Sequence, residues 1–168
     1  SLSRDLDIDV AQLRVQARHG PFGHAWSFLH QRLMGARVVP IVPVLLNTYY
    51  PPNQPTPRRC HQLGRAIRQA IEDWPARKRV AVLASGGLSH FFVDEELDRH
   101  VLDLLAKKDG DALSVLPPAQ LESGNSEIRN WIAPGGAAEH LAMRLVDYVP
   151  SYRSAAGSGV GMAFAVWQ

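Results

Sequence analysis

The sequence lacks the features that mark several large classes of protein. It has one cysteine, Cys60, so no disulfide can form within the chain, and a small secreted scaffold held by internal disulfides is excluded. It has no apolar run of about eighteen residues and no signal-peptide pattern, which predicts a cytoplasmic protein without a membrane span. Its net charge is only +2, with charges of both signs interspersed, so no basic stripe favours nucleic-acid binding.

What the sequence does contain is enough apolar material for one core. Hydrophobic residues make up 46% of its 168 positions, and a chain of this length buries roughly two thirds of its unfolded surface on folding. No internal repeat and no low-complexity linker divides it. We therefore expect a single domain over residues 1–168.

Apolar runs of strand length alternate with helical patterns along the chain. Strands are predicted at residues 38–46, 80–84, 143–149 and 160–166. Helices are predicted at residues 9–18, 22–34, 57–74, 94–108 and 126–132, with short helical turns at 111–122. This alternation predicts an α/β layered fold, with a central mixed or mostly parallel sheet flanked by helices.

The clearest helix start lies at Thr56 and Pro57. Threonine caps helix N-termini and proline suits the first helical position. The helix that follows has an apolar stripe with helical spacing, which we expect to face the sheet. The stripe consists of Cys60, Leu63, Ile67, Ala70, Ile71 and Trp74.

The most informative stretch begins with the apolar run Val80–Ala84. It ends in Ser85-Gly86-Gly87-Leu88-Ser89-His90, and ligands of open α/β sheets bind beyond the carboxyl ends of the strands. His90 is therefore the best candidate for an acid–base residue, because histidine titrates near neutral pH. A histidine that is only hydrogen-bonded at a strand end is the structural alternative.

A carboxylate, Glu127, follows a Gly-Asn-Ser turn at the start of a predicted helix. It could serve proton transfer with His90 or bind a metal ion. Acidic residues are also common in a first helical turn simply because they interact favourably with the helix dipole. The chemical reading requires that His90 and Glu127 lie around one shared hollow, and this is the main geometric prediction.

Several stretches, in order, resemble the class III extradiol ring-cleavage dioxygenases, the superfamily of the protocatechuate 4,5-dioxygenase catalytic subunit. They cover nearly the whole chain, and several motifs in the right order are more specific than one alone. The stretches are His24–Phe28, Pro40–Pro52, Ser85–His90, Gly124–Trp131 and Asp147–Arg153.

This resemblance implies a non-haem Fe(II) enzyme that opens a catechol-type ring with O₂, beside rather than between the two hydroxyls. His90 and His24 would handle protons, and Glu127 would be the carboxylate of a two-histidine, one-carboxylate iron site. Asn47 and Tyr50 would be candidates for substrate contacts, with a purely structural role in their loop as the alternative.

Neighbours of Glu127 complete the expected site. Arg129 is expected to pair with Glu127, and Asn125 or Asn130 to orient it through hydrogen bonds.

In the family, both iron-binding histidines lie upstream of all the stretches that match here. Nothing before His19 supplies them, and the spacing of His19 and His24 around Gly20 and Pro21 leaves a metal pair undefined. We therefore expect the chain to correspond to the C-terminal portion of such an enzyme. It would pack against a missing N-terminal segment or form a homo-oligomer; the alternative is a catalytically inactive remnant or accessory subunit without iron.

Other readings of the same residues are weaker. A metal-dependent hydrolase would lack the same ligands. The glycine-rich stretch Gly157–Gly161 is followed by no helical pattern, which a phosphate-binding loop needs. The stretch Gly87–Phe91 lacks the final glycine of a hydrolase nucleophile elbow.

Overall fold

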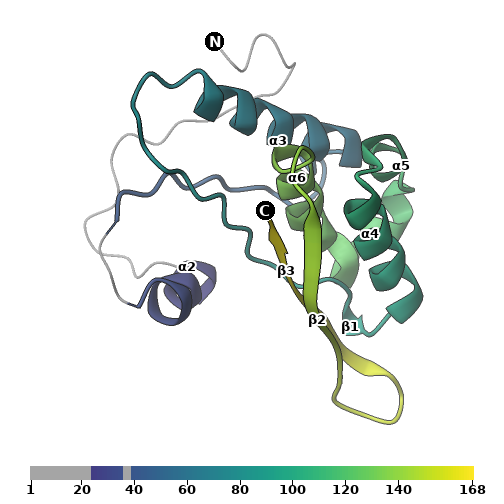
Figure 1. Ribbon diagram of the computed structural model, residues 1–168. Helices are drawn as coiled ribbons and strands as arrows, with labels where there is room; N and C mark the ends of the chain where they lie inside the picture. Colours follow the sequence, from purple (N-terminus) through teal and green to yellow (C-terminus); the bar gives the residue numbers. More distant parts are fainter. Residues whose placement is uncertain (1–23, 36–38) are drawn as a thin grey trace.

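A computed structural model of the protein describes residues 24–35 and 39–168. Figure 1 shows the order and labels of the elements. The helical elements are α2 (His24–Phe28), the π-helix η1 (Leu29–Leu33), α3 (Pro57–Glu72), α4 (Glu95–Lys107), α5 (Gly110–Ser114), the 3₁₀ helices η2 (Pro118–Leu121) and η3 (Ser123–Ile128), and α6 (Arg129–Ala137). The strands are β1 (His90–Phe92), β2 (Met143–Tyr152) and β3 (Ser158–Trp167).

The three strands form one antiparallel sheet in the order β1-β3-β2. Strands β2 and β3 are a long hairpin in register from Met143↔Trp167 to Tyr152↔Gly159, with an irregularity between Leu145 and Asp147. The short β1 pairs His90 with Val160 on the other edge of β3. The α/β class is thus confirmed in its coarse form, but a mostly parallel central sheet is not what the described residues form.

Two predicted strands are absent from this sheet. Residues 39–46 and 80–84 are assigned to no strand, although the two C-terminal strands lie where their patterns predicted. A β-branched run becomes a strand only when a neighbour pairs its N–H and C=O groups, and Pro40 and Pro43 remove two donors from the first run. Many of its side chains are therefore exposed, Val42 by 89% and Leu45 by 82%.

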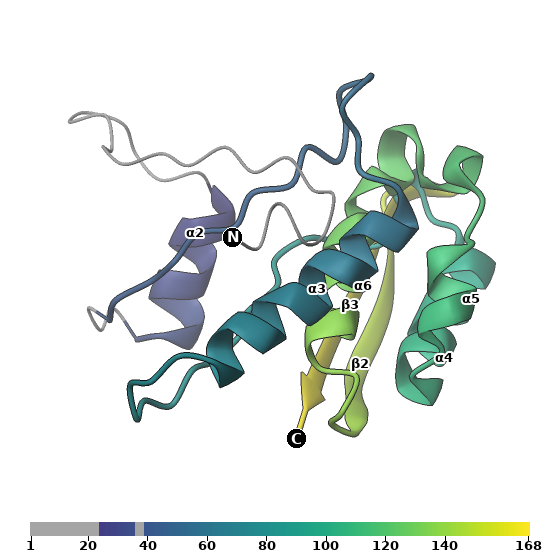
Figure 2. The same cartoon turned by 90° about the horizontal axis from the view of Figure 1, so that it is seen from above.

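Helix α3 packs against α6 rather than against the sheet. Figures 1 and 2 both show the two helices side by side. Two glycines make the approach possible: a Cβ on Gly64 would collide with the backbone carbonyl of Ala133, and one on Gly136 with that of His61. The prediction that the apolar stripe of α3 faces the sheet is therefore wrong. Small residues at the contact let the backbones of α3 and α6 approach each other closely.

The core lies between these helices, α4 and the inner face of the hairpin. Val101, Leu121 and Ile132 are fully buried in it, and the inner face of the hairpin packs against it through Met143, Tyr148, Ala163, Ala165 and Trp167. Cys60 belongs to the same core, and burial raises the pKa of its thiol to about 12.

Helix starts agree with the predicted caps. Thr56 Oγ1 accepts a hydrogen bond from Arg59 N–H at 3.2 Å, and Asp94 Oδ1 accepts one from Leu97 N–H at 3.0 Å. The predicted helix at 126–132 divides into η3 and α6, and the predicted helix at 9–18 lies outside the described residues. In the part of the chain that the structure describes, no helix is long and apolar enough to cross a membrane.

Candidate active site

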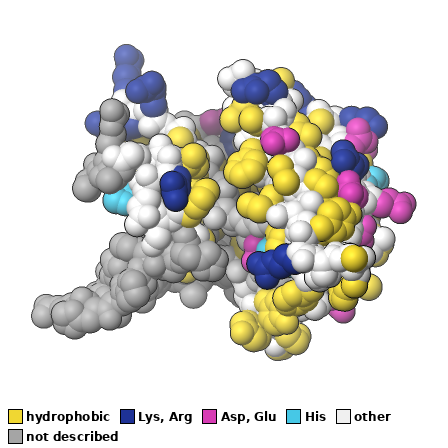
Figure 3. Space-filling view, turned by 90° about the horizontal axis from the view of Figure 1, so that it is seen from below, with side chains coloured by type: hydrophobic (Ala, Val, Ile, Leu, Met, Phe, Trp, Pro, Cys, Tyr) yellow, Lys and Arg dark blue, Asp and Glu magenta, His cyan; other side chains and the backbone are white. Residues whose placement is uncertain are grey.

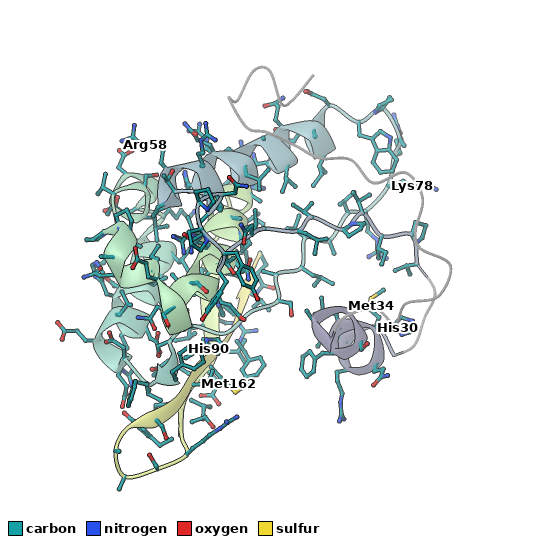
Figure 4. The ribbon with its side chains drawn as sticks, turned by 180° about the vertical axis from the view of Figure 1, so that it is seen from behind. His30, Met34, Arg58, Lys78, His90 and Met162 are labelled. Carbon is teal, nitrogen blue, oxygen red and sulfur yellow. The ribbon has the colours of Figure 1, made fainter. Side chains whose placement is uncertain are left out.

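His90 is the first residue of strand β1 and follows a bend at Leu88 and Ser89 (Figure 4 labels His90). Its Nδ1 lies 3.0 Å from the carbonyl oxygen of Leu88. A carbonyl oxygen can only accept, so Nδ1 carries the proton of the neutral ring and Nε2 keeps its lone pair. Local backbone geometry thus selects which nitrogen of His90 is free to act as a base.

Glu127 reaches the same place from η3. Its Oε2 lies 3.8 Å from His90 Nε2 and accepts a hydrogen bond of 2.9 Å from the backbone N–H of Gly87. The side chains of His90 and Glu127 are 26% and 40% exposed, so a small molecule can reach both. The structure therefore brings together the imidazole and the carboxylate that the sequence singled out, while their chemical roles stay predictions.

Glycines make this approach possible. A Cβ on Gly87 would lie 3.0 Å from His90 Nε2, and one on Gly86 would lie 2.9 Å from Asn130 Nδ2 and 3.2 Å from Glu127 Oε2. The indole of Trp131 holds this segment by donating to the carbonyl of Gly86 at 3.1 Å. Asn130 thus lies near Glu127, and its role in orienting that carboxylate stays a prediction.

Gly124 in η3 lies against His90 and Phe91 of strand β1. A Cβ there would collide with the carbonyl of His90 and lie 3.0 Å from the ring of Phe91. Phe91 itself has a positive φ of 67°, a conformation that bulky residues rarely adopt. The absence of a side chain at Gly124 therefore allows η3, which carries Glu127, to lie against β1.

Replacing Gly124 with alanine is expected to lower the free energy of unfolding by about 1–3 kcal/mol, the usual range for overpacking a close contact. The added methyl group must push η3 away from β1, because the obstacle is backbone rather than a flexible side chain. Urea unfolding measures the change. An unfolding curve that coincides with that of the unmodified chain would show that the contact does not hold η3 in place.

Arg129 does not pair with Glu127, contrary to prediction. Its buried guanidinium donates to three backbone carbonyls, those of Pro55 at 2.8 Å, Thr48 at 3.3 Å and Leu121. Burial is the main cause that lowers the pKa of this group. Arg129 therefore ties the loop that contains Thr48 and Pro55 to the segment before η3.

Asn47 and Tyr50 lie in that loop and bond to each other. The Asn47 side chain donates to the carbonyl of Tyr50 at 2.6 Å and accepts from its N–H at 3.0 Å. The ring of Tyr50 is largely exposed and meets Tyr49 edge to face at 5.2 Å between ring centres. The amide of Asn47 thus shapes the loop, and a substrate contact by either residue stays a prediction.

His24 begins α2, but its side chain lies outside what the structure describes. Figure 4 shows the helical segment that carries His30 and Met34 well apart from His90. A joint role of His24 and His90 therefore stays a prediction.

One buried acid near His90 escaped sequence reasoning. Asp98 is fully buried on α4 and accepts hydrogen bonds from Ser89 N–H at 2.8 Å, Ser89 Oγ at 2.8 Å and Tyr148 OH at 2.9 Å. The available signal was an aspartate directly after Leu97 on the apolar side of a predicted helix. Its partners, Ser89 on the preceding loop and Tyr148 on β2, lie on other elements, and no periodicity reveals such contacts.

The expected iron site requires three ligands from histidine and carboxylate side chains. Among residues 24–35 and 39–168, no group of three or more histidine, cysteine, aspartate or glutamate side chains is placed to hold a metal ion. The described residues offer one carboxylate, Glu127, with one imidazole beside it. They do not make up an iron site by themselves.

Comparison with a family model gives a match over residues 26–162, and the model is described as the catalytic LigB subunit of aromatic ring-opening dioxygenase. The match includes both His90 and Glu127.

Individual relatives agree with this family. A gallate dioxygenase of Pseudomonas putida is 43% identical over 74 residues, which are 40% of this chain and 22% of the relative. A 2,3-dihydroxyphenylpropionate/2,3-dihydroxicinnamic acid 1,2-dioxygenase of Dechloromonas aromatica is 36% identical over 87 residues, 51% of this chain and 26% of the relative. The corresponding enzyme of Xanthobacter autotrophicus is 35% identical over 89 residues, 53% of this chain and 26% of the relative. The matches thus span about a quarter of each relative's length.

Proposed function

Because this chain belongs to the family of the catalytic LigB subunit of aromatic ring-opening dioxygenases, we propose that it takes part in extradiol cleavage of a catechol-type ring by O₂. The observation that carries the proposal is the pairing of His90 Nε2 with Glu127 Oε2 at 3.8 Å. This pairing supports the proposal because an imidazole and a carboxylate, the group types expected of a base and of an anionic metal ligand, lie next to each other on accessible surface.

His90 is the proton-transfer residue in this proposal. Its Nδ1–H is held by the Leu88 carbonyl, so Nε2 accepts a proton from a catechol hydroxyl and returns it later in the reaction. Glu127 Oε2 lies 3.8 Å from Nε2. In this proposal His90 therefore alternates between base and acid next to the carboxylate that is the proposed metal ligand.

Glu127 is the proposed carboxylate ligand of Fe(II), which activates O₂ and the catechol in such enzymes. The other ligands would come from outside the described residues, since these lack the complete set. The hydrogen bond from Gly87 N–H leaves Glu127 Oε1 available.

Exposed apolar segments support the proposal that further polypeptide covers this chain in the working enzyme. Figure 3 shows hydrophobic side chains gathered over one face of the molecule. The exposed apolar residues include Val42 and Leu45 of the first unpaired run, Leu83 of the second, and Met162 and Phe164 of β3. Exposed apolar surface is the kind that protein interfaces bury, and the proposed partner is the rest of the dioxygenase or a second copy.

Turnover with iron tests the proposal. The chain is assayed alone and as a chimera in which residues 26–162 replace the corresponding segment of the Pseudomonas putida gallate dioxygenase. After anaerobic loading with Fe(II), each preparation receives O₂ and a panel of gallate, protocatechuate and 2,3-dihydroxyphenylpropionate. Oxygen uptake together with a yellow ring-fission product is expected from the chimera. A folded chimera that forms no product from any of these catechols would favour an inactive remnant instead.

Replacing His90 with glutamine in the chimera is expected to lower kcat by about 10²–10⁴-fold, the usual contribution of a general acid–base residue. Glutamine retains polarity but cannot carry a proton between substrate atoms. His100, exposed on α4, gives the matched control, and His100→Gln is expected to leave kcat unchanged. A His90→Gln chimera with undiminished kcat would remove His90 from the chemistry.

A further inference from the structure

Asp98 combines complete burial with bonds to the residue that precedes His90. Both Asp98 and Ser89 have no exposed surface. Two of the three bonds that Asp98 accepts come from Ser89, one from its N–H and one from its hydroxyl, each 2.8 Å long. The third comes from the hydroxyl of Tyr148 on β2 at 2.9 Å. An acid on α4 is thus bonded mainly to the loop that carries His90.

Every polar group of Ser89 is occupied in this arrangement. Besides its two bonds to Asp98, its Oγ accepts from Asp94 N–H at 2.9 Å. Its carbonyl accepts from Gly161 N–H at 2.8 Å, and the carbonyl of Gly161 accepts from Leu88 N–H at 2.9 Å. Leu88 and Ser89 therefore have a single backbone orientation, set by α4 on one side and β3 on the other.

That orientation determines where the carbonyl of Leu88 points. It is the carbonyl that accepts from His90 Nδ1, and a rotation of the Leu88–Ser89 peptide would withdraw it. Gly161 brings β3 close enough to take part, since a Cβ there would collide with Asp98 Oδ2. The bonds run without a break from Asp98 through Ser89 and Leu88 to the imidazole.

We propose that Asp98 is a positioning residue for His90, which holds the Leu88 carbonyl against Nδ1 and so keeps Nε2 as the unprotonated nitrogen that faces Glu127. The inference rests on the proposed acid–base role of His90, which needs that nitrogen free. Asp98 does not touch the reacting groups. It acts on His90 through the hydrogen bond between Nδ1 and the Leu88 carbonyl.

A purely stabilising role fits Asp98 less well. Burial is the first cause that raises its pKa, so its ionised form is less favourable in the folded chain than in the unfolded one. Such a group therefore lowers the stability of the fold as the pH rises through its titration. An apolar side chain of similar size would avoid this loss but would release Ser89.

The experiment measures which ring nitrogen of neutral His90 carries the proton. Substitution of a residue that only stabilises the fold would not move that proton from one nitrogen to the other. Long-range ¹H–¹⁵N correlation spectra of the ¹⁵N-labelled chain at about pH 9, where ordinary histidines are neutral, distinguish the Nδ1–H from the Nε2–H form. Loss of one set of signals in His90→Gln assigns the residue. We expect Nδ1–H as the major form of His90 in the unmodified chain, and Nε2–H as the major form in Asp98→Leu, which removes the acceptor of the Ser89 N–H and so frees the Leu88–Ser89 peptide to rotate.

Asp103→Leu is the matched control, since Asp103 lies on the same helix but is exposed and paired with Lys107 at 2.7 Å. It is expected to keep the Nδ1–H form. If Asp98→Leu does not fold by circular dichroism, Asp98→Ala replaces it, because alanine also removes the acceptor of the Ser89 N–H and adds no bulk. A folded variant that keeps the Nδ1–H form, or an unmodified chain that shows Nε2–H, would overturn the proposal. The spectra need neither iron nor substrate, so failure of ring opening and failure of this inference are separate results.

Discussion

Replacing Glu127 with glutamine is expected to reduce ring opening by the dioxygenase chimera to background. Glutamine has nearly the same size, and its side-chain oxygen can still accept the 2.9 Å bond from Gly87 N–H. The substitution thus removes the negative charge and leaves the contact. Loss of a proposed anionic ligand should weaken Fe(II) binding by more than about 100-fold, the upper range for losing a partner of a metal ligand.

Bound iron and product formation measure this effect together. Glu96, exposed on α4, supplies the matched control, and Glu96→Gln should bind iron and turn over like the unmodified chimera. If the Glu127→Gln chimera retained both its iron and its activity, the carboxylate would have no part in the site and the iron ligand would have to be sought elsewhere.

The second large effect concerns stability. Arg129→Met is expected to lower the free energy of unfolding by about 3 kcal/mol, because it leaves partly or fully buried carbonyls without a donor, each worth about 1–3 kcal/mol. Removal of a buried positive charge offsets part of that loss, as the lowered pKa of Arg129 indicates. Methionine fills most of the volume, so a cavity contributes little.

Urea unfolding of the chain alone is the measurement, and no substrate is needed. Arg58, exposed on the same chain at the start of α3, provides the control, since Arg58→Met should change stability by no more than about 0.5 kcal/mol. Equal stability of the two variants would mean that water replaces the guanidinium at the carbonyls of Thr48, Pro55 and Leu121 without loss.

Local signals predicted much of the fold correctly. The starts of α3 and α4 followed from Thr56 and Asp94, because a cap acts within one turn of its own helix. The two C-terminal strands followed from their apolar runs, but their antiparallel pairing as a hairpin was not predicted. The run Val80–Ala84 failed as a strand for the opposite reason: its composition is that of a strand, but pairing depends on a neighbour that the pattern does not contain.

The candidate active site, like the fold, was predicted correctly only in part. His90 and Glu127 were identified from their motifs, and the structure places them together. The role of Arg129 was predicted wrongly, since proximity in sequence favoured Glu127 whereas its guanidinium bonds to carbonyls as far away as Thr48. Asp98 was missed because its partner Tyr148 comes from β2, 50 residues later. Contacts between elements depend on packing, which periodicity does not report.

The buried thiol of Cys60 can serve as a probe of local unfolding in this protein. Cys60 lies on α3 with 1% of its surface exposed, and burial raises the pKa of its thiol to about 12. A thiol-specific dye can therefore label it only when the packing around α3 opens locally. The labelling rate, followed as denaturant is added, would report how often this local opening occurs while the rest of the chain stays folded.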